Sequence, residues 1–449
     1  MTSMGRLIGT WAAFALLVGG CTPGGSSRPT TGERVITFWQ PFDSNLTPSL
    51  EKLVAAFERE HPGVRVRMSF ASNNLTSSQK LFLAVAGGVG PDVCFVDGQQ
   101  LAEWAARGAM TDLTEATAQA GLRAEDFWGP RWRESTFRDR VYAIPWSADP
   151  NFAFVWNKDL FRQAGLDPEK APRTIDDLDE ANRRLTKRSA NGGLVNVGLV
   201  PWQWGGSNSL FTWGYAFGGN FYEEPSEKFP VGQVTADNPG VVRALTWMAT
   251  FAKKYDVRKV NAYNSQFVGV SNNPFYLGKQ GMSVLHVTQL KDLKKYAPTV
   301  DYGIGLIPAP LDGEYPTGWI GGWSLGIPRG KKPSADAMEF VRWMCTSDQA
   351  TEIMAKEMDA FPAYRRSPAF ERIKADPERR VFYEILQNSK HVRTLMPVQG
   401  YFMNLLQRAS DNVLYGGADP KTALAEASAK AQERLEGVIS AVDQREGGR

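Results

Sequence analysis

Aromatic rings and planar polar side chains gather where the first predicted strand ends. The stretch 35–44, VITFWQPFDS, places Trp39, Gln40 and Asp43 close together. Asp97, followed by glycine, ends a later predicted strand in a similar way. A flat ring beside hydrogen-bonding groups suits a ligand that has an apolar face and a rim of hydroxyls. The alternatives are a packed ring for Trp39, a turn or capping role for Asp43 and a turn role for Asp97.

A second aromatic segment covers residues 201–219 and reads PWQWGGSNSLFTWGYAFGG. Its paired glycines separate rings from polar groups, which suggests a wall of a binding cleft. We expect Trp204 and Asn208 to contact a ligand there. Trp213 and Phe217 are four residues apart and fit the buried face of a helix instead.

The elements around these residues alternate between strand and helix. A strand from residue 35 is followed by a helix from about residue 47, whose apolar residues recur every three or four positions. A strand returns at 64–70, where apolar and polar residues alternate, and the run at 92–98 predicts a buried strand. This order is typical of a mostly parallel sheet covered by helices. Ligands of such sheets bind beyond the carboxyl ends of the strands, where these polar and aromatic residues occur.

The sequence lacks the motifs of several enzyme classes. His61, His286 and His391 are its three histidines, and they do not have the spacing of metal ligands. It contains no Gly-x-Ser-x-Gly nucleophile elbow, and AGGVGP at 86–91 lacks the Lys and Ser/Thr of a phosphate-binding loop. A glycoside hydrolase needs only two facing carboxylates, and 48 acidic residues leave that alternative open. We expect a binding protein rather than an enzyme, with no cofactor or metal.

The start of the chain has the pattern of an export signal and a tether. Arg6 precedes an apolar run over 7–18, which is shorter than the roughly 20 residues of a membrane span. Cys21 follows two glycines and resembles the cysteine of a bacterial lipobox. We expect a signal peptide over 1–20, lipidation of Cys21 and a flexible tether over 21–34. The protein would then be extracytoplasmic and anchored to the cell membrane; a plain signal peptide with an incidental cysteine is the alternative.

The composition is that of an ordinary globular protein. The chain is 43% hydrophobic and 22% charged with a net charge of +3, and it has no basic cluster interleaved with aromatics, which argues against binding nucleic acid. Cys94 and Cys345 each lie in an apolar run. They are either buried thiols or one disulfide formed in an oxidising compartment.

Several short motifs occur along the chain in a distinctive order. They are PDV at 91–93, NKDLF at 157–161 with AGL at 164–166, GKQGM at 278–282 and GGWSLGIP at 321–328. This order resembles that of the extracellular solute-binding proteins, in particular the carbohydrate-binding, maltose-binding-like branch that serves ABC importers. The resemblance covers about residues 35 to 440. It implies a two-lobed α/β fold of the periplasmic-binding-protein type, in which each lobe is a mostly parallel sheet flanked by helices and hinge strands join the lobes.

The resemblance also implies how the chain is divided. We expect the N-terminal lobe to comprise 35–147 and 318–358, and the C-terminal lobe to comprise 148–317 and 359–449. The ligand would lie in the cleft between the lobes, which would close over it by hinge motion. The implied partners are a small carbohydrate and the permease subunits of an ABC importer with their ATPase, and we expect a monomer.

Further cleft residues follow from the resemblance. The glycines before Trp323 would let the backbone approach a ligand closely. Tyr364 and Arg365 occupy positions where the family often has a cleft contact, whereas Asp149 belongs to the hinge or to the site. A surface role for Arg365 and a structural role for His286 are the alternatives. The full set of expected ligand-binding residues is Trp39, Gln40, Asp43, Asp97, Asp149, Trp204, Asn208, His286, Gly321, Gly322, Trp323, Tyr364 and Arg365.

The sequence leaves the identity of the ligand open. A neutral sugar would use rings such as Trp39 and Trp323, and an amino sugar would require Asp43 or Asp97 near its ammonium group. A glycerophosphodiester, bound by some relatives, would require Arg365 or another cation on the phosphate. A scaffold lipoprotein without a small-molecule cleft is a further alternative.

Overall fold

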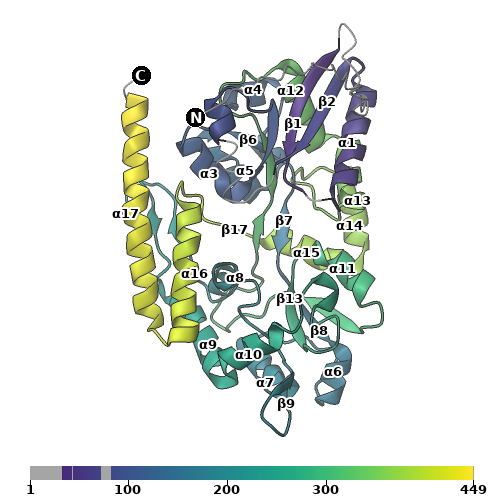
Figure 1. Cartoon of the computed structure of the whole chain (residues 1–449), viewed down its shortest axis with the longest axis vertical. Coiled ribbons are helices and arrows are strands. Elements are labelled where there is room, and N and C mark those ends of the chain that lie inside the picture. Colours follow the sequence, from purple (N-terminus) through teal and green to yellow (C-terminus); the bar gives the residue numbers. More distant parts are fainter. Residues whose placement is uncertain (1–32, 43, 72–81, 448–449) are drawn as a thin grey trace, which may run out of the picture.

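The computed structural model describes residues 33–42, 44–71 and 82–447 and shows two lobes joined near the middle of the molecule (Figure 1). The first lobe, at the top of the view, holds the first strands of the chain, and the second lobe lies below it. The expected two-lobed α/β fold is therefore confirmed. The predicted signal peptide, the lipidation site Cys21, the tether up to residue 32 and the candidate Asp43 lie outside the described residues.

A five-stranded sheet forms the centre of the first lobe. Its order is β2-β1-β3-β16-β6, and β1 pairs in parallel with β2 and β3. The later strand β16 lies antiparallel between β3 and β6. The strand–helix–strand order predicted for the start of the chain is confirmed. The bounds are β1 Arg34–Gln40, α1 Thr47–Glu60, β2 Val64–Phe70, β3 Val93–Asp97, α3 Gly98–Ala106, β6 Ala143–Pro145, β16 Trp323–Gly326, α12 Ala335–Thr346 and α13 Asp348–Glu357.

The second lobe is built on a smaller sheet in which β8 lies between β13 and β14. Both pairings are antiparallel, whereas the resemblance to the binding-protein family implies a mostly parallel sheet in each lobe. The reason is the path of the chain, because β8 directly follows one hinge strand and β14 leads back towards another. The bounds are β8 Ala153–Asn157, α6 Lys158–Gln163, α7 Ile175–Leu185, α8 Gly206–Ala216, α9 Pro239–Tyr255, α10 Val257–Asn264, β13 Met282–Leu285, α11 Gln289–Tyr296 and β14 Tyr302–Gly305.

A third sheet, of order β17-β15-β7, connects the lobes. β7 (Asp149–Asn151) pairs antiparallel with β15 (Trp319–Gly321), and β17 (His391–Val392) runs parallel to β15. The expected lobe boundaries at 147/148 and 317/318 fall directly before β7 and β15. Ser147 also bridges to Pro362, where the chain passes the hinge again. Helices α14 (Ala369–Ala375) and α15 (Pro377–Asn388) follow that bridge.

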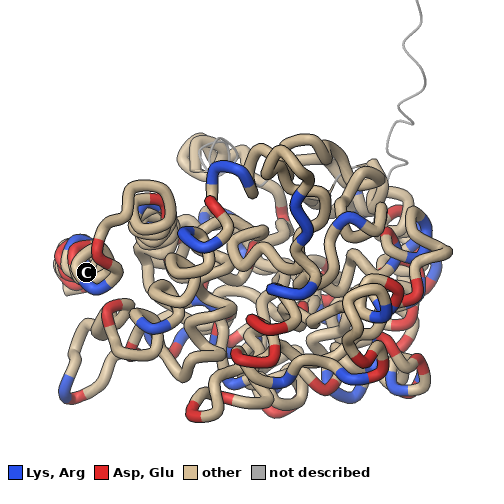
Figure 2. Tube along the Cα trace, turned by 90° about the horizontal axis from the view of Figure 1, so that it is seen from below, with Lys and Arg blue, Asp and Glu red and all other residues tan. Residues whose placement is uncertain are grey.

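Two long helices end the chain along one side of both lobes (Figure 1). α16 (Gln399–Gly416) and α17 (Pro420–Gly447) pack against each other and against the core of the second lobe. The end of α17 reaches the first lobe, where Arg138 pairs with Asp443 at 2.5 Å and with Glu446 at 2.9 Å. Figure 2, which shows α17 end-on, also shows acidic and basic residues mixed over this side.

The structure decides between the two alternatives for Cys94 and Cys345. Cys94 and Cys345 are both buried and free, so they are thiols rather than a disulfide. Cys345 Sγ lies 3.7 Å from the carbonyl oxygen of Ile144, inside the first core cluster. Both behave as small hydrophobic side chains, and burial raises the pKa of each thiol.

Candidate ligand-binding site

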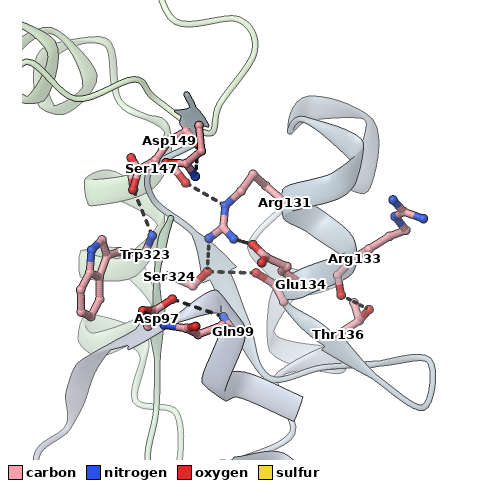
Figure 3. Close-up of polar contacts among 12 residues, drawn as sticks. Asp97, Gln99, Arg131, Arg133, Glu134, Thr136, Ser147, Asp149, Trp323 and Ser324 are labelled. Carbon is pink, nitrogen blue, oxygen red and sulfur yellow. Dashed lines mark hydrogen bonds and ion pairs between the residues drawn. The ribbon is translucent and has the colours of Figure 1, made fainter. Parts of the chain in front are cut away.

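Hinge strand β7 and the first-lobe strand β3 bring two carboxylates to the region where the lobes meet (Figure 3). Asp149 begins β7 and lies opposite Gly321 of β15, while Asp97 ends β3 and lies opposite Trp323 of β16. Asp97 also caps α3, because its carboxylate accepts hydrogen bonds from the backbone and side-chain amides of Gln99. Asp97 therefore caps a helix, where the sequence left a turn role open, and its carboxylate still faces the charges described below.

A buried ion pair lies next to these carboxylates. Arg131 pairs with Glu134 one helical turn away in α5 (Gly129–Glu134), and the two residues are 0% and 2% exposed. Arg131 Nε donates to the carbonyl of Ser147 at 2.9 Å, and its Nη2 donates to Ser324 Oγ at 3.0 Å. These bonds connect α5 to both the hinge and β16, so the guanidinium fixes the backbone that carries Asp149.

The electrostatics of the site centre on Asp149. Burial raises the pKa of this carboxyl to about 6, and the nearby Asp97 adds to the rise, whereas Arg131 and the Ser147 side chain oppose it. Burial lowers the pKa of Arg131 to about 10, against the attraction of Asp149 and Asp97. The charged form of Asp149 thus lacks part of the solvation that water would provide. Hydroxyl groups of a ligand would restore that solvation.

The second part of the site contributes a cation. Arg393, just after β17, lies with its guanidinium carbon 4.8 Å from the ring centroid of Trp319, and its Nη2 donates to Asn208 Oδ1 at 3.3 Å. Burial lowers the pKa of Arg393, and the charges of Asp97 and Asp149 oppose that effect. Arg393 also lines a cavity of about 330 Å³ beside Tyr215. The carboxylates of Asp97 and Asp149 and the guanidinium of Arg393 are therefore close enough for their charges to interact.

Aromatic side chains of the second lobe surround this group. Trp204 stacks on Phe152 with the ring centroids 4.9 Å apart, and its Nε1 donates to the carbonyl of Val284 at 3.0 Å. His286 meets the same Phe152 ring edge-on at 5.9 Å. Burial and the nearby charge of Arg393 lower the pKa of His286 to about 4, so the imidazole is neutral at pH 7. Trp204 and His286 both contact Phe152, and Asn208 contacts Arg393, whose charge also acts on His286. The three predicted residues therefore lie in one region.

The glycine-rich segment before Trp323 packs closely against the hinge backbone, and its expected approach to a ligand stays a prediction. Gly322 has φ of +141°, and a Cβ there would lie 2.3 Å from the carbonyl oxygen of Ser147. Its own carbonyl accepts from the amide of Gly98 at 3.0 Å. The amide of Trp323 donates to Ser147 Oγ at 3.0 Å, and its ring lies against Phe42 at 5.1 Å. Trp323 is half-buried, so part of its ring remains available to a ligand.

The residues predicted at the first strand exit have mixed surroundings. Gln40 is 2% exposed, and its amide oxygen accepts from the backbone amide of Phe42 at 2.6 Å. This oxygen therefore already stabilises the turn after β1. Gln40 nevertheless lines a groove of about 560 Å³ with Phe42, Met68 and Phe70. Trp39 is half-buried and packs against the small core cluster around Cys94. Ligand contact by Trp39 and Gln40 stays a prediction.

Tyr364 and Arg365 lie at a different part of the hinge. Tyr364 contacts Phe127 edge-on at 6.1 Å, and Arg365 lies over the ring of Trp128 with its guanidinium carbon 5.3 Å from the ring centroid. Arg365 is exposed. Among the contacts of the described residues, none joins this pair to the group around Asp149, and their role in binding stays a prediction.

Sequence reasoning missed five residues that shape the site: Arg131, Glu134, Phe152, Trp319 and Arg393. The spacing of Arg131 and Glu134 within GPRWRE indicates that they share a helix face, but it does not reveal their burial. Arg393 follows a strand of only two residues, which leaves no periodic pattern to detect.

The arrangement suits recognition of a polar, uncharged or weakly charged molecule. Carboxylates accept hydrogen bonds, a guanidinium and an amide donate them, and rings cover apolar faces. Within the described ranges no group of three or more His, Cys, Asp or Glu residues has metal-binding geometry. In the same part of the chain, no helix combines the length and apolar character needed to cross a membrane.

Two lobes joined by hinge strands, with polar and aromatic side chains where they meet, define the class of two-lobed binding proteins. Residues 43–351 match the bacterial extracellular solute-binding protein family, and the chain belongs to that family. The sn-glycerol-3-phosphate-binding periplasmic protein UgpB of Shigella flexneri is 22% identical over 357 residues, which are 76% of this chain and 76% of that protein.

Solved structures share the same fold. CpMnBP1 with mannobiose bound has a TM-score of 0.75 and 24% identity, covering 89% of this chain and 100% of that chain. The GacH receptor of Streptomyces glaucescens, solved unliganded and in complex with acarbose, has a TM-score of 0.72 and 20% identity over 90% of this chain and 99% of that chain. The resemblance expected from the order of the sequence motifs is therefore confirmed at the level of family and fold.

Proposed function

We propose that this protein captures a carbohydrate between its lobes and delivers it to an ABC importer. The observation that carries the proposal is the convergence of Asp97, Asp149 and Arg393 near the half-buried ring of Trp323. Charged planar groups flanked by rings match the hydroxyl rim and the C–H faces of a sugar. The carbohydrates bound by CpMnBP1 and the GacH receptor support this ligand class.

The proposal includes export and anchoring. A lipid on Cys21 would hold the body outside the cytoplasm at the cell membrane, within reach of the importer's permease subunits. The lobes would close on the ligand, because a ligand shifts the equilibrium between open and closed forms by its preference for the closed form. The permease would recognise the closed monomer.

A glycerophosphate-type ligand is the second candidate. Similarity to the glycerol-3-phosphate-binding UgpB favours it, and Arg393 offers a cation in the site. Arg393 replaces Arg365 as the residue that we expect to contact a phosphate, because Arg365 is exposed and lies over Trp128. The two carboxylates beside Arg393 would repel a phosphate, which is why a carbohydrate is preferred.

A thermal-shift screen tests the proposal. The full chain carrying Cys21→Ser would be screened against mono- and oligosaccharides, amino sugars and glycerophosphodiesters. A ligand at a hundred times its dissociation constant adds about 2.7 kcal/mol to the free energy of unfolding. We expect one carbohydrate class to raise the melting temperature, with Arg183→Ala, at an exposed pair within α7, as a variant that retains the shift. A folded protein that responds to none of a broad panel would overturn the proposal, and turnover of a chromogenic glycoside would indicate an enzyme instead.

A further inference from the structure

A basic pocket of about 450 Å³ lies between the first lobe and the end of α17, outside the ligand-binding site. Its cationic lining residues are Arg140, Arg329, Lys331, Lys332 and Arg445. Two acids, Asp112 and Glu446, the phenol of Tyr142 and the hydroxyl of Thr111 complete the polar part of the lining. Four of the cations belong to the first lobe, and Arg445 belongs to α17.

The acids near this pocket are already paired. Asp112 pairs with Arg140 at 3.5 Å, and Glu446 pairs with Arg138 at 2.9 Å. Lys331 has its own partner in Asp92 at 3.3 Å. Within the part of the chain that the structure describes, Arg329, Lys332 and Arg445 have no carboxylate at ion-pair distance. The pocket therefore holds three positive charges that lack a counter-charge from the described residues.

Two of these cations converge on one point. A Cβ built on Gly108 would lie 2.9 Å from Nη1 of Arg329 and 3.4 Å from Nη1 of Arg445, so the two guanidinium groups are neighbours. Like charges this close repel each other, and α17 nevertheless brings Arg445 here, where its Nη2 donates to the carbonyl of Ala106. An anion between the two groups would turn this repulsion into attraction.

The loop that carries Arg329, Lys331 and Lys332 is held in place by hydrogen bonds. Thr111 Oγ1 donates to the carbonyls of Pro328 at 3.0 Å and of Lys331 at 3.3 Å. The amide of Arg329 donates to the carbonyl of Ala109 at 2.8 Å. The backbone that carries these cations is thus ordered before any ligand arrives, which lowers the entropic cost of binding.

We propose that the basic pocket binds a phosphate-class oxyanion, held by the guanidinium groups of Arg329 and Arg445 with Lys332 and the Tyr142 hydroxyl beside it. Guanidinium groups bind such oxyanions through paired, charge-assisted hydrogen bonds. Because Arg329 belongs to the first lobe and Arg445 to α17, the bound anion fastens α17 to the first lobe.

The anion has two possible sources with the same chemistry, free phosphate and the phosphate headgroup of an anionic lipid. The loop that carries Arg329, Lys331 and Lys332 lies near the end of the sheet where β1 begins. Asp92 shows this, because it contacts both Lys331 and Thr37 of β1. Arg34, the first residue of β1, pairs with Asp336 just beyond this loop at 3.1 Å. The described chain begins at this end of the body, so the lipid proposed on Cys21 would bring membrane headgroups within reach of the pocket.

Calorimetric titration of inorganic phosphate into the Cys21→Ser full chain at low ionic strength tests the pocket. Co-sedimentation with phosphatidylglycerol vesicles, compared with phosphatidylcholine vesicles, tests the lipid source. We expect Arg329→Ala and Arg445→Ala each to weaken binding about tenfold, because each removes charge-assisted hydrogen bonds. Lys421→Ala removes a charge from the opposite end of α17 and should leave binding unchanged, and Arg329→Lys should restore part of it.

Each outcome decides the proposal. Phosphate binding that both arginine variants weaken supports a soluble anion, and vesicle binding with the same mutational pattern supports a lipid headgroup. Absence of both, or binding that Lys421→Ala weakens as much as Arg445→Ala does, overturns the site. Circular dichroism of each variant shows that a loss of binding does not come from a loss of fold.

Discussion

Arg393 lies over the ring of Trp319, with its guanidinium carbon 4.8 Å from the ring centroid, and donates to Asn208 at 3.3 Å. This stacking holds the guanidinium plane in one orientation, which a flexible lysine would not reproduce. The same charge faces Asp97 and Asp149. Arg393 is therefore positioned to bind a ligand, and its charge opposes the rise in the pKa of Asp149.

Replacing Arg393 tests whether this position serves binding. Arg393→Met removes a charge-assisted donor worth about 1.5–3 kcal/mol, so we expect the dissociation constant of the ligand identified in the screen to rise at least tenfold. Arg393→Lys keeps the charge but loses the stacked plane and should recover only part of the affinity. Titration calorimetry measures both variants. Equal affinity in Arg393→Met and the unmodified chain would remove Arg393 from the site.

The pKa of Asp149 predicts how binding depends on pH. Burial raises this pKa to about 6 in the unliganded protein, and hydroxyls that donate to the carboxylate would lower it in the complex. Binding below about pH 6 must then release a proton, so affinity should be about tenfold lower near pH 5 than near pH 7.5. The dissociation constant measured across this range checks the prediction. Asp149→Asn should bind more weakly, and its dissociation constant should no longer change between pH 5 and pH 7.5. If the pH dependence of the dissociation constant is unchanged in this variant, another group releases the proton.

The same shift predicts an effect on stability. The pKa of Asp149 is higher in the folded protein than its usual value of 3.8, so the folded state binds this proton more tightly than the unfolded chain. The stabilisation of the folded state by this proton is complete at low pH and is lost as the pH rises to about 6. Above that pH the free energy of unfolding is lower by at most about 3 kcal/mol. Asp149→Asn should therefore melt higher than the unmodified chain near pH 7.5, and this advantage should shrink near pH 4. Asp237→Asn, at an exposed position, should show no such difference.

The first lobe was largely predictable from the sequence, whereas the site was predictable only in part. The strands and helix at 34–70 carry strong periodic patterns, and the pattern located Asp97 correctly at a strand end. The residues that complete the site come from distant segments, such as Arg393 after a two-residue strand. The pairing of β7 with β15 brings these segments together, and hinge strands of three residues show no periodicity. The same lack of local pattern explains why the antiparallel order of β13, β8 and β14 could not be predicted.

Gly322 offers a test of the close backbone approach beside the site. Gly322→Ala places a methyl group 2.3 Å from the carbonyl oxygen of Ser147, which also accepts from Arg131, and it strains a φ of +141°. The strain alone costs about 1–3 kcal/mol, and displacing Ser147 adds to it. We expect a clear drop in the urea midpoint and weaker ligand binding. Gly269→Ala has a φ of +90° with open space around it, so it should lose less stability and keep its affinity.

The contact between Arg138 and the end of α17 predicts a role in coupling this helix to the first lobe. Arg138 pairs with Asp443 at 2.5 Å and Glu446 at 2.9 Å, and all three side chains are partly exposed. Exposed pairs contribute little each, so Arg138→Ala should weaken the docking of α17 by about 1 kcal/mol, or about fivefold in population. Hydrogen exchange of the last two turns of α17 measures this directly and should become faster.

A matched control separates this contact from a general loss of charge. Arg183 forms an exposed pair with Glu180 within one helix of the second lobe, at 2.7 Å. Arg183→Ala therefore removes the same kind of interaction without touching α17, and exchange at residues 440–447 should stay unchanged. If Arg138→Ala also leaves that exchange unchanged, the apolar contacts of α17, such as buried Ile439 and Val442, hold its end without the ion pairs. Faster exchange together with weaker ligand binding would show that the docked helix belongs to the ligand-binding form of the protein.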